Sequence, residues 1–310
     1  MRADSYFKEL RLGSTNLFNA RFPDEKCCIG EFYSRRWRDG YFCVRCKNKK
    51  VAGSIRKVIQ CSKCRHQKSV ISGSIFERSH LPLRKWFIAI WLLTKFSILN
   101  NSPKANIRLK DKFKDLTKNG RIYTYEHGFS GNEVQQLLGI RGYKTIWAIM
   151  HKLRQFLKTK IEIRKFNGLV VMGEVSFGGK EILVILGGKP TSVSLKYIYR
   201  YSSLEKIAIV RDIVEPGSTI LTPLVDKYKE LINAGYLLEK ITENQFISSK
   251  ASRAMNPLDR WWNISHLRAV ETKYIDEYLS EFAFKWNNRG YYKERVLFYY
   301  LLDLIAKNSN

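Results

Sequence analysis

Acidic residues and long apolar runs are both scarce in this sequence. The 310 residues include 28 aspartates and glutamates against 55 lysines and arginines, which leaves a formal net charge of +27. The longest apolar run, residues 86–93, is far shorter than the roughly 20 residues that a membrane-spanning helix needs. The opening stretch MRADSYFKEL lacks the apolar core of a signal peptide, and no lipidation motif is visible. These absences predict a soluble, intracellular protein with no membrane partner, whose cysteines stay reduced.

The basic excess indicates a polyanionic partner. Lysines and arginines that neutralise phosphates release condensed counterions, so a protein with this charge favours nucleic acid. A merely basic soluble protein is the plainer alternative. With 45% hydrophobic residues the chain can bury a real core, and its length predicts two or more modules.

Four of the six cysteines stand in two C-x-x-C pairs. Cys43 and Cys46 form the first pair, and Cys61 and Cys64 form the second after fourteen intervening residues. Two such pairs can supply four thiolates to one tetrahedral Zn²⁺, and the β-prone stretch SIRKVIQ between them suits a zinc ribbon. Disulfides or a redox motif are the alternatives, and a reducing compartment argues against disulfides. Because four sulfur ligands leave no open position, we expect the zinc to be structural.

Basic side chains surround these cysteine pairs. A zinc-stabilised hairpin with such a coating is suited to contact with the DNA backbone, although a solvated basic face would have the same composition. The residues predicted to contact DNA here are Lys47, Lys49, Lys50, Arg56, Lys57, Lys63 and Arg65.

The middle of the chain contains two predicted helical regions. Residues 79–98 predict a buried connecting helix, and residues 99–127 form a basic insertion. In residues 128–160 two amphipathic helices meet at Gly139, and the second has one apolar and one basic face. This pattern indicates a helix-turn-helix, with an ordinary helical hairpin as the alternative. Its predicted DNA-contacting residues are Tyr143, Lys144, Lys152 and Arg154.

After Phe166 the pattern changes to short β-prone stretches. GLVVM, EILVILG, SVSLKYIYRY and STILT are separated or followed by helical segments, which predicts a mixed α/β layer fold. The pair Trp261 and Trp262 and the aromatic-rich end of the chain are interpreted as core packing.

Several of these stretches together resemble insertion-sequence transposases of the ISXO type and the related Merlin elements. The resemblance runs from about residue 38 to about residue 298, with an interruption near 97–127, through DGYFCVRC, LPLRKWF, YKTIWAIMHKLR, EVSFGGK, PGSTILT, NPLDRWW and EFAFKWNNR. It implies an RNase H-like transposase domain at 165–310, a helix-turn-helix at 128–160 and a zinc ribbon at 38–78, after an N-terminal arm at 1–37. Such transposases bind double-stranded DNA at their own terminal repeats, commonly as multimers, so the resemblance also implies a homo-oligomer on DNA.

The resemblance implies that three acids hold two Mg²⁺ ions for DNA cleavage and joining. The first position falls on Gly173, the second on Pro223 and the third on Asp259. Since neither glycine nor proline has a carboxylate, we expect a transposase-derived DNA-binding protein with a degenerate catalytic centre. One alternative is an active, Mg²⁺-dependent enzyme with Glu174 and Asp226 as replacement acids, and another is a scaffold that binds no DNA. Glu174 should point to the opposite face of its strand from position 173.

Two further departures from the family's pattern are visible. His266 stands where the family has a lysine, and an extra residue near 141–142 loosens the match of the helix-turn-helix. A DNA-binding protein of this kind is expected in the nucleus of a eukaryotic host, or in the nucleoid or cytoplasm of a bacterium.

Overall fold

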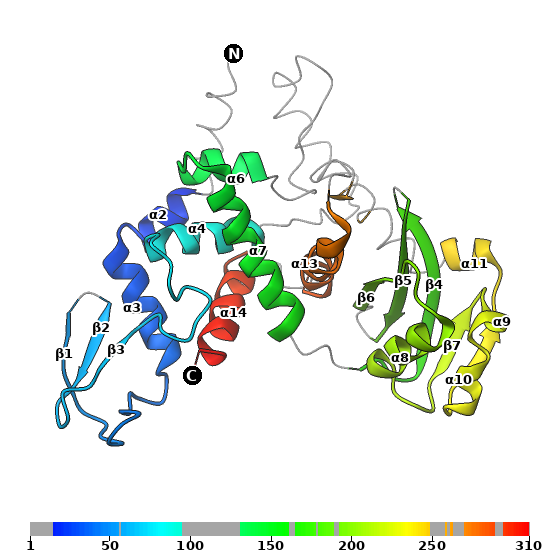
Figure 1. Cartoon of the computed structure of the whole chain (residues 1–310), viewed down its shortest axis with the longest axis horizontal. Coiled ribbons are helices and arrows are strands. Elements are labelled where there is room, and N and C mark those ends of the chain that lie inside the picture. The colour runs from blue at the N-terminus through cyan, green and yellow to red at the C-terminus, as the bar shows by residue number, and fades with distance from the viewer. Residues whose placement is uncertain are drawn as a thin grey trace, which may run out of the picture.

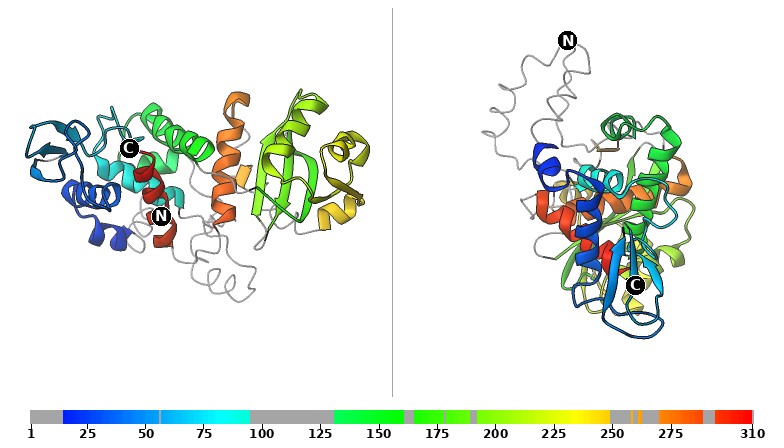
Figure 2. Two further views of the ribbon diagram at one scale, coloured as in Figure 1. Left: turned by 90° about the horizontal axis from the view of Figure 1, so that it is seen from below. Right: turned by 90° about the vertical axis from the view of Figure 1, so that its left-hand side faces the viewer.

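The computed structural model describes residues 15–55, 57–94, 131–160, 165–177, 179–188, 192–248, 258, 261–262, 270–288 and 294–309. These residues form a helical body with a small three-stranded sheet, and a second body built on a five-stranded sheet (Figure 1). One helix, α13 (Ile275–Asn287), lies between the two bodies, as Figure 2 also shows. Within the described residues, no helix combines the length and the apolar character needed to span a bilayer.

The helical body brings together segments from both ends of the chain. Its helices are α2 (Thr15–Arg21), α3 (Glu25–Arg36), α4 (Leu83–Thr94), α6 (Gly131–Leu138), α7 (Tyr143–Lys160) and α14 (Glu294–Lys307). Three aromatic rings show how these segments meet: Phe22 follows α2, Phe87 lies on α4 and Phe298 lies on α14. Their ring centroids are 5.2 to 5.8 Å apart, and all three side chains are buried. The C-terminal helix therefore closes the core that the N-terminal helices begin.

This packing differs from the predicted domain boundaries in two places. The predicted N-terminal arm, 1–37, contributes α2 and α3 to a buried core. Helix α14 was predicted within the 165–310 domain, but it packs against α3 and α4 instead. Its apolar spacing marks a buried face without identifying the partner of that face. Of the predicted connecting helix at 79–98, α4 is described; the insertion at 99–127 lies outside the described residues.

The small sheet is an antiparallel meander next to the cysteine pairs. It comprises β1 (Val51–Ile55), β2 (Val58–Cys61) and β3 (Gln67–Ser69), in that order. On β2, Ile59 and Cys61 alternate with more exposed residues, and their side chains join the core of the helical body. This alternation is typical of a strand with one face on a core.

The large sheet has the strand order β6-β5-β4-β7-β8 and mixes antiparallel with parallel pairs. The strands β4 (Leu169–Phe177), β5 (Lys180–Gly187) and β6 (Ser192–Tyr197) form an antiparallel meander. Helix α8 (Ser203–Ile213) then leads to β7 (Thr219–Thr222), and α9 (Val225–Tyr228) and α10 (Glu230–Asn233) lead to β8 (Leu237–Lys240). The strand β7 is parallel to β4, and β8 is parallel to β7. The predicted mixed α/β fold is confirmed.

Two apolar clusters cover the two faces of this sheet. Val170 and Met172 of β4 belong to the cluster that includes α8 and α9. Val171 and Val175 face the other cluster, which contains α13, α11 (Glu243–Ser248) and the tryptophan pair at 261–262. Both tryptophans are buried, which confirms their predicted place in the core.

Helix α13 contacts the sheet with one side and α7 with the other. Its apolar side packs in the cluster beside β6, whereas Glu277 and Glu281 accept hydrogen bonds from α7. Arg154 Nε donates to Glu281 across 2.6 Å, and Lys158 Nζ donates to Glu277 across 3.0 Å. Lys285 also donates to Glu281. Buried charges paired in this way fix α7 relative to the helix that covers the large sheet.

Candidate metal site and candidate catalytic positions

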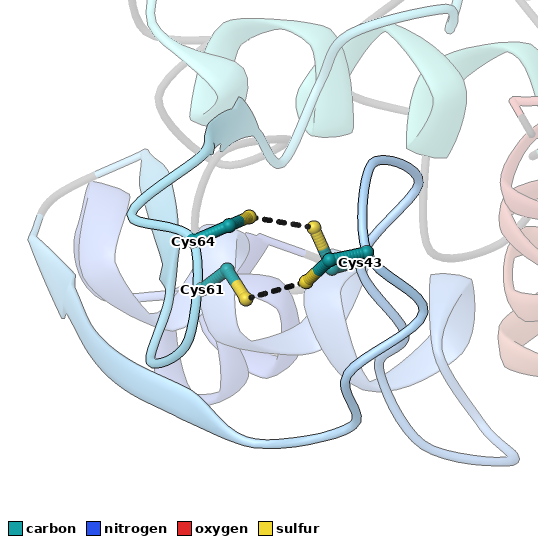
Figure 3. Close-up of side chains that lie close together, drawn as sticks. Cys43, Cys61 and Cys64 are labelled. Carbon is teal, nitrogen blue, oxygen red and sulfur yellow. Dashed lines mark hydrogen bonds between the residues drawn. The ribbon is translucent and has the colours of Figure 1, made fainter.

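The four cysteines of the two C-x-x-C pairs converge on one point. Their sulfur atoms all lie within 4.8 Å of one another, with Cys43 Sγ 3.5 Å from Cys64 Sγ and Cys46 Sγ 3.6 Å from Cys61 Sγ. Figure 3 shows Cys61 and Cys64 facing Cys43 across this point. A tetrahedral zinc ion with Zn–S distances of about 2.3 Å requires sulfur atoms about 3.8 Å apart. The four side chains therefore fit a zinc ion, as the spacing predicts.

Both cysteine pairs have the same backbone turn. The N–H of Lys47 donates to the Cys43 carbonyl (2.8 Å), and the N–H of Arg65 donates to the Cys61 carbonyl (3.2 Å). The residue after each pair is left-handed, with φ 58° at Lys47 and φ 59° at Arg65. This conformation is uncommon for residues that carry a Cβ. The repeated turn directs the two thiols of each pair toward the same point.

One of these thiols is prepared for metal binding by its own loop. The backbone N–H of Cys64 and the side-chain amide of Asn48, 3.5 Å from Cys61 Sγ, outweigh the effect of burial and lower the pKa of the Cys61 thiol to about 6. Cys61 is thus a thiolate near neutral pH, the form that binds zinc. Cys28 contrasts with it, because burial raises its pKa to about 12.

Most of the predicted basic residues near the cysteines are exposed. Exposed side chains are found at Lys47, Lys49, Lys50, Lys63 and Arg65. Lys57 is instead ion-paired with Glu25 at 2.6 Å, and that carboxylate also accepts the first backbone N–H groups of α4. Arg56 lies outside the described residues. Five exposed basic residues therefore lie close in the chain to the four cysteines, whereas Lys57 is held in an ion pair with Glu25.

Helices α6 and α7 form the predicted pair joined at Gly139, which is left-handed with φ 60°. Tyr143, Lys144 and Lys152 on α7 are exposed. Arg154 is not: it is 5% exposed, bonded to Glu281, and its guanidinium lies 3.8 Å from the ring centroid of Tyr278. Its predicted contact with DNA is wrong, because α13 covers this side of α7.

An aromatic ring fills the space beside Gly173, the position that the resemblance assigns to the first acid. Gly173 lies on β4, and a Cβ at this position would lie 2.5 Å from Phe246 Cζ and 2.7 to 2.8 Å from two further ring atoms. Real Cβ atoms do not approach carbon atoms this closely. Phe246 comes from α11 and is itself buried. Even an alanine side chain would displace the ring, and a carboxylate would meet an apolar surface.

The second position lies at the neighbouring strand end. In the parallel pair of β4 and β7, Val171 is opposite Leu221. Gly173 follows Val171 by two residues on β4, and Pro223 follows Leu221 by two residues just after the end of β7, so the two positions that the resemblance identifies lie beyond the same end of this strand pairing. Thr222 Oγ1, just before the proline, accepts the N–H of Leu224 and closes a local turn (3.1 Å).

Glu174 occupies the opposite face of β4 and is already bound. Its carboxylate accepts hydrogen bonds from Tyr228 (2.5 Å), Lys227 (2.6 Å) and Lys206 (3.3 Å). Burial alone would raise the pKa of Glu174, but the bonds from Lys227 and Tyr228 and the charge of Lys206 outweigh it and hold the pKa below its ordinary value. The predicted orientation of Glu174 is confirmed by the position of its three partners.

Neither proposed replacement acid belongs to a metal-ligand cluster. Asp226 is exposed on α9. Among the residues that the structure describes, only the four cysteines form a group of three or more side chains (Asp, Glu, His or Cys) close enough together to hold a metal ion. Asp259 and His266 lie outside the described residues. Phe246 and the three partners of Glu174 carried no sequence signal for these roles, since only the fold brings them to β4.

Comparison with known proteins gives one partial likeness in sequence. No family model matches the chain. An "Uncharacterized protein in transposable element ISH50" of Halobacterium salinarum is 39% identical over 96 residues, which cover 29% of this chain and 32% of that protein. The chain thus matches about a third of the length of this curated relative. Among solved structures, a simian T-cell lymphotropic virus intasome in complex with PP2A regulatory subunit B56 gamma is similar over 50% of this chain and 64% of that chain, at 13% identity and a TM-score of 0.28, too low to support an inference.

Proposed function

We propose that this chain is a transposase-derived DNA-binding protein that does not cleave DNA. The partial identity to a transposable-element protein supports the transposase origin, and the resemblance of the motifs favours the ISXO and Merlin type. The mixed five-stranded sheet with apolar clusters on both faces is consistent with an RNase H-like domain. The four-cysteine site and its small sheet are consistent with a zinc ribbon.

The absence of cleavage rests on the contact between Gly173 and Phe246. A two-metal site needs carboxylates that converge on one point. At the first position there is neither a carboxylate nor room for one, because the aromatic ring fills it. Glu174, one residue later, faces the other side and is paired with two lysines. Glu174 offers a carboxylate, but the ammonium groups of Lys206 and Lys227 beside it would repel a metal ion.

DNA binding would use two exposed basic surfaces of the helical body. One surrounds the four cysteines, where zinc would hold the two pairs in shape, and the other is the exposed side of α7 with Tyr143, Lys144 and Lys152. Each lysine that neutralises a phosphate makes binding more sensitive to salt, by a slope of about 0.9 in log affinity against log salt for duplex DNA. The partner would be double-stranded DNA, including the terminal repeats of an element, bound by a homo-oligomer in the nucleus, nucleoid or bacterial cytoplasm.

The test uses zinc-loaded protein and supercoiled plasmid with Mg²⁺ or Mn²⁺, beside a duplex-binding titration at several salt concentrations. We expect salt-sensitive duplex binding and no nicking. Lys144→Ala should weaken binding and lower the salt slope by about 0.9, whereas Lys240→Ala, an exposed lysine on the far edge strand, should change neither. Nicking that Asp259→Ala abolishes would favour the alternative of an active enzyme with replacement acids. Duplex affinity that does not respond to salt or to Lys144→Ala would favour the scaffold.

A further inference from the structure

The strand β6 ends in an exposed turn rich in tyrosine, here called the tyrosine turn (residues 198–201). The N–H of Tyr201 donates to the carbonyl of Ile198 at 3.1 Å and closes the turn. Tyr199 and Tyr201 are 45% and 40% exposed, and Arg200 stands between them. The Arg200 guanidinium lies 5.2 Å from the ring centroid of Tyr199. An exposed cation thus lies beside the ring of Tyr199, and the exposed ring of Tyr201 follows it in the chain.

Arg200 has an unfavourable backbone conformation. Its φ is 63°, in the left-handed region that glycine enters without strain. A glycine would satisfy the turn, so the backbone alone does not account for an arginine here. Among the described residues Arg200 forms no ion pair, and its side chain is therefore available to a ligand. Strained residues of this kind are concentrated at binding and catalytic sites.

Aromatic and basic side chains continue along the surface from this turn. The ring of Tyr197 is nearly parallel to that of Tyr199, with centroids 6.2 Å apart and planes at 19°. Beyond Tyr197, Lys180 Nζ lies 3.4 Å from Thr272 Oγ1. Asp276 Oδ1 accepts the backbone N–H of Tyr197 at 3.0 Å. Two more acids lie nearby, because Glu181 is exposed beside Tyr197 and the Glu205 carboxylate accepts from Ser202 directly after the turn, so the surface combines flat rings with charges of both signs.

The tyrosine turn also lies at a particular end of the large sheet. Both β4 and β6 are antiparallel to β5, so they run in the same direction. Their carboxyl ends, together with that of β7, lie at one edge of the sheet. This is the end of the sheet where open α/β sheets commonly bind ligands, and Pro223 directly follows β7 there.

We propose that the tyrosine turn binds unpaired, single-stranded nucleic acid, with bases stacked on Tyr199 and Tyr201 and Arg200 on a phosphate. Exposed ring faces suit unpaired bases, because the bases of a duplex already stack on one another and offer only their edges. Arg200, which stands between the two tyrosines in the chain, suits the phosphate that links two stacked bases. The choice of nucleic acid as the ligand rests on the proposed function. The site itself is separate from the proposed duplex-binding surfaces of the helical body.

Binding is tested with the full-length, zinc-loaded protein by fluorescence anisotropy. The probes are a labelled oligothymidine of about 12 nucleotides, within the span of one such surface, and a labelled duplex. Tyr199→Ala and Tyr201→Ala should each weaken oligothymidine binding about tenfold and leave duplex binding within twofold. Tyr199→Phe keeps a ring and should keep the affinity. Tyr300→Ala, which removes a 36% exposed ring on α14, is the matched control and should change neither probe.

Arg200→Gly provides a second test, because a purely structural role of Arg200 would not predict its effect on oligothymidine binding. It relieves the backbone strain, so thermal stability should stay equal or rise while oligothymidine binding weakens and its salt slope falls by about 0.7. Unchanged oligothymidine affinity in both tyrosine variants overturns the proposal, as does an equal loss for both probes. A wild-type protein that binds oligothymidine but no duplex would refute the proposed duplex-binding function and leave this site standing.

Discussion

Gly173→Ala is expected to destabilise the protein, although alanine normally stabilises a strand relative to glycine. With room for the methyl group, the substitution would gain roughly 0.5–1 kcal/mol by reducing the entropy of the unfolded chain. Here the methyl carbon would lie 2.5 Å from Phe246 Cζ. Forcing extra volume into a packed core costs about 1–3 kcal/mol. The overpacking outweighs the gain, and we expect a net loss of about 1–2 kcal/mol in the free energy of unfolding.

Removing the ring should reverse the sign of this effect. Phe246→Ala alone should cost about 3–5 kcal/mol, as is usual for a buried phenylalanine. In that background, Gly173→Ala no longer meets the ring and should stabilise by roughly 0.5–1 kcal/mol. The two substitutions are therefore coupled by about 2 kcal/mol, a size typical of residues in direct contact. Urea unfolding of the four proteins, followed by circular dichroism, measures this coupling.

A second glycine provides the control. Gly30 lies on the exposed side of α3, and a Cβ there would have nothing within 4 Å. Gly30→Ala should raise the free energy of unfolding by up to about 1 kcal/mol, because alanine is the better helix former. If Gly173→Ala behaved like Gly30→Ala in the wild-type background, the ring would not fill the acid position. The structural reason for the absence of a carboxylate would then be lost.

Three further predictions concern other parts of the molecule. Cys61→Ser should reduce bound zinc, measured by elemental analysis, whereas Cys27→Ser, an exposed cysteine outside the site, should not; equal zinc in both would contradict the four-cysteine site. The pKa of Glu174 is lowered from 4.5, so its pairing stabilises the fold above that pH and is lost as the pH falls through the folded pKa. Glu174→Gln should therefore lower the melting temperature at pH 7 and approach wild type toward pH 3; a constant difference would refute the pairing. Arg154→Ala should lower the free energy of unfolding by about 3–5 kcal/mol, because it removes one partner of the buried Glu281 carboxylate. A variant with wild-type stability and weakened duplex binding would instead show that Arg154 contacts DNA.

The sequence predicted those features whose chemistry is local. Each C-x-x-C pair sits on its own turn, and the four thiols meet in an arrangement that fits one zinc ion. Glu174 points away from position 173 because side chains alternate along any strand. The change from helical to β-prone stretches after Phe166 was enough to predict a mixed α/β layer, which the strand order confirms.

Features that depend on distant partners were not predictable from local patterns. The apolar stripe of α14 indicates a buried face, but either the helices of the N-terminal part or the large sheet would satisfy it. Arg154 lies among basic residues on α7, and only the presence of Glu281 and Tyr278 on α13 explains its burial. Phe246 belongs to a short helix after the last strand, and nothing near it in the sequence relates it to Gly173.

Under the proposed function, the contact at Gly173 would make the lack of an acid site a property of the fold and not only of two residue types. An aspartate at position 173 would be pressed against a buried ring, and Phe246 would have to leave its cluster before the carboxylate could reach a metal ion. Pro223 would have to change as well, since one restored acid does not make a two-metal site. Each change alone costs stability or contributes nothing to metal binding. In this proposal the sheet serves as a packed scaffold, and the exposed lysines and tyrosines are the groups that would contact nucleic acid.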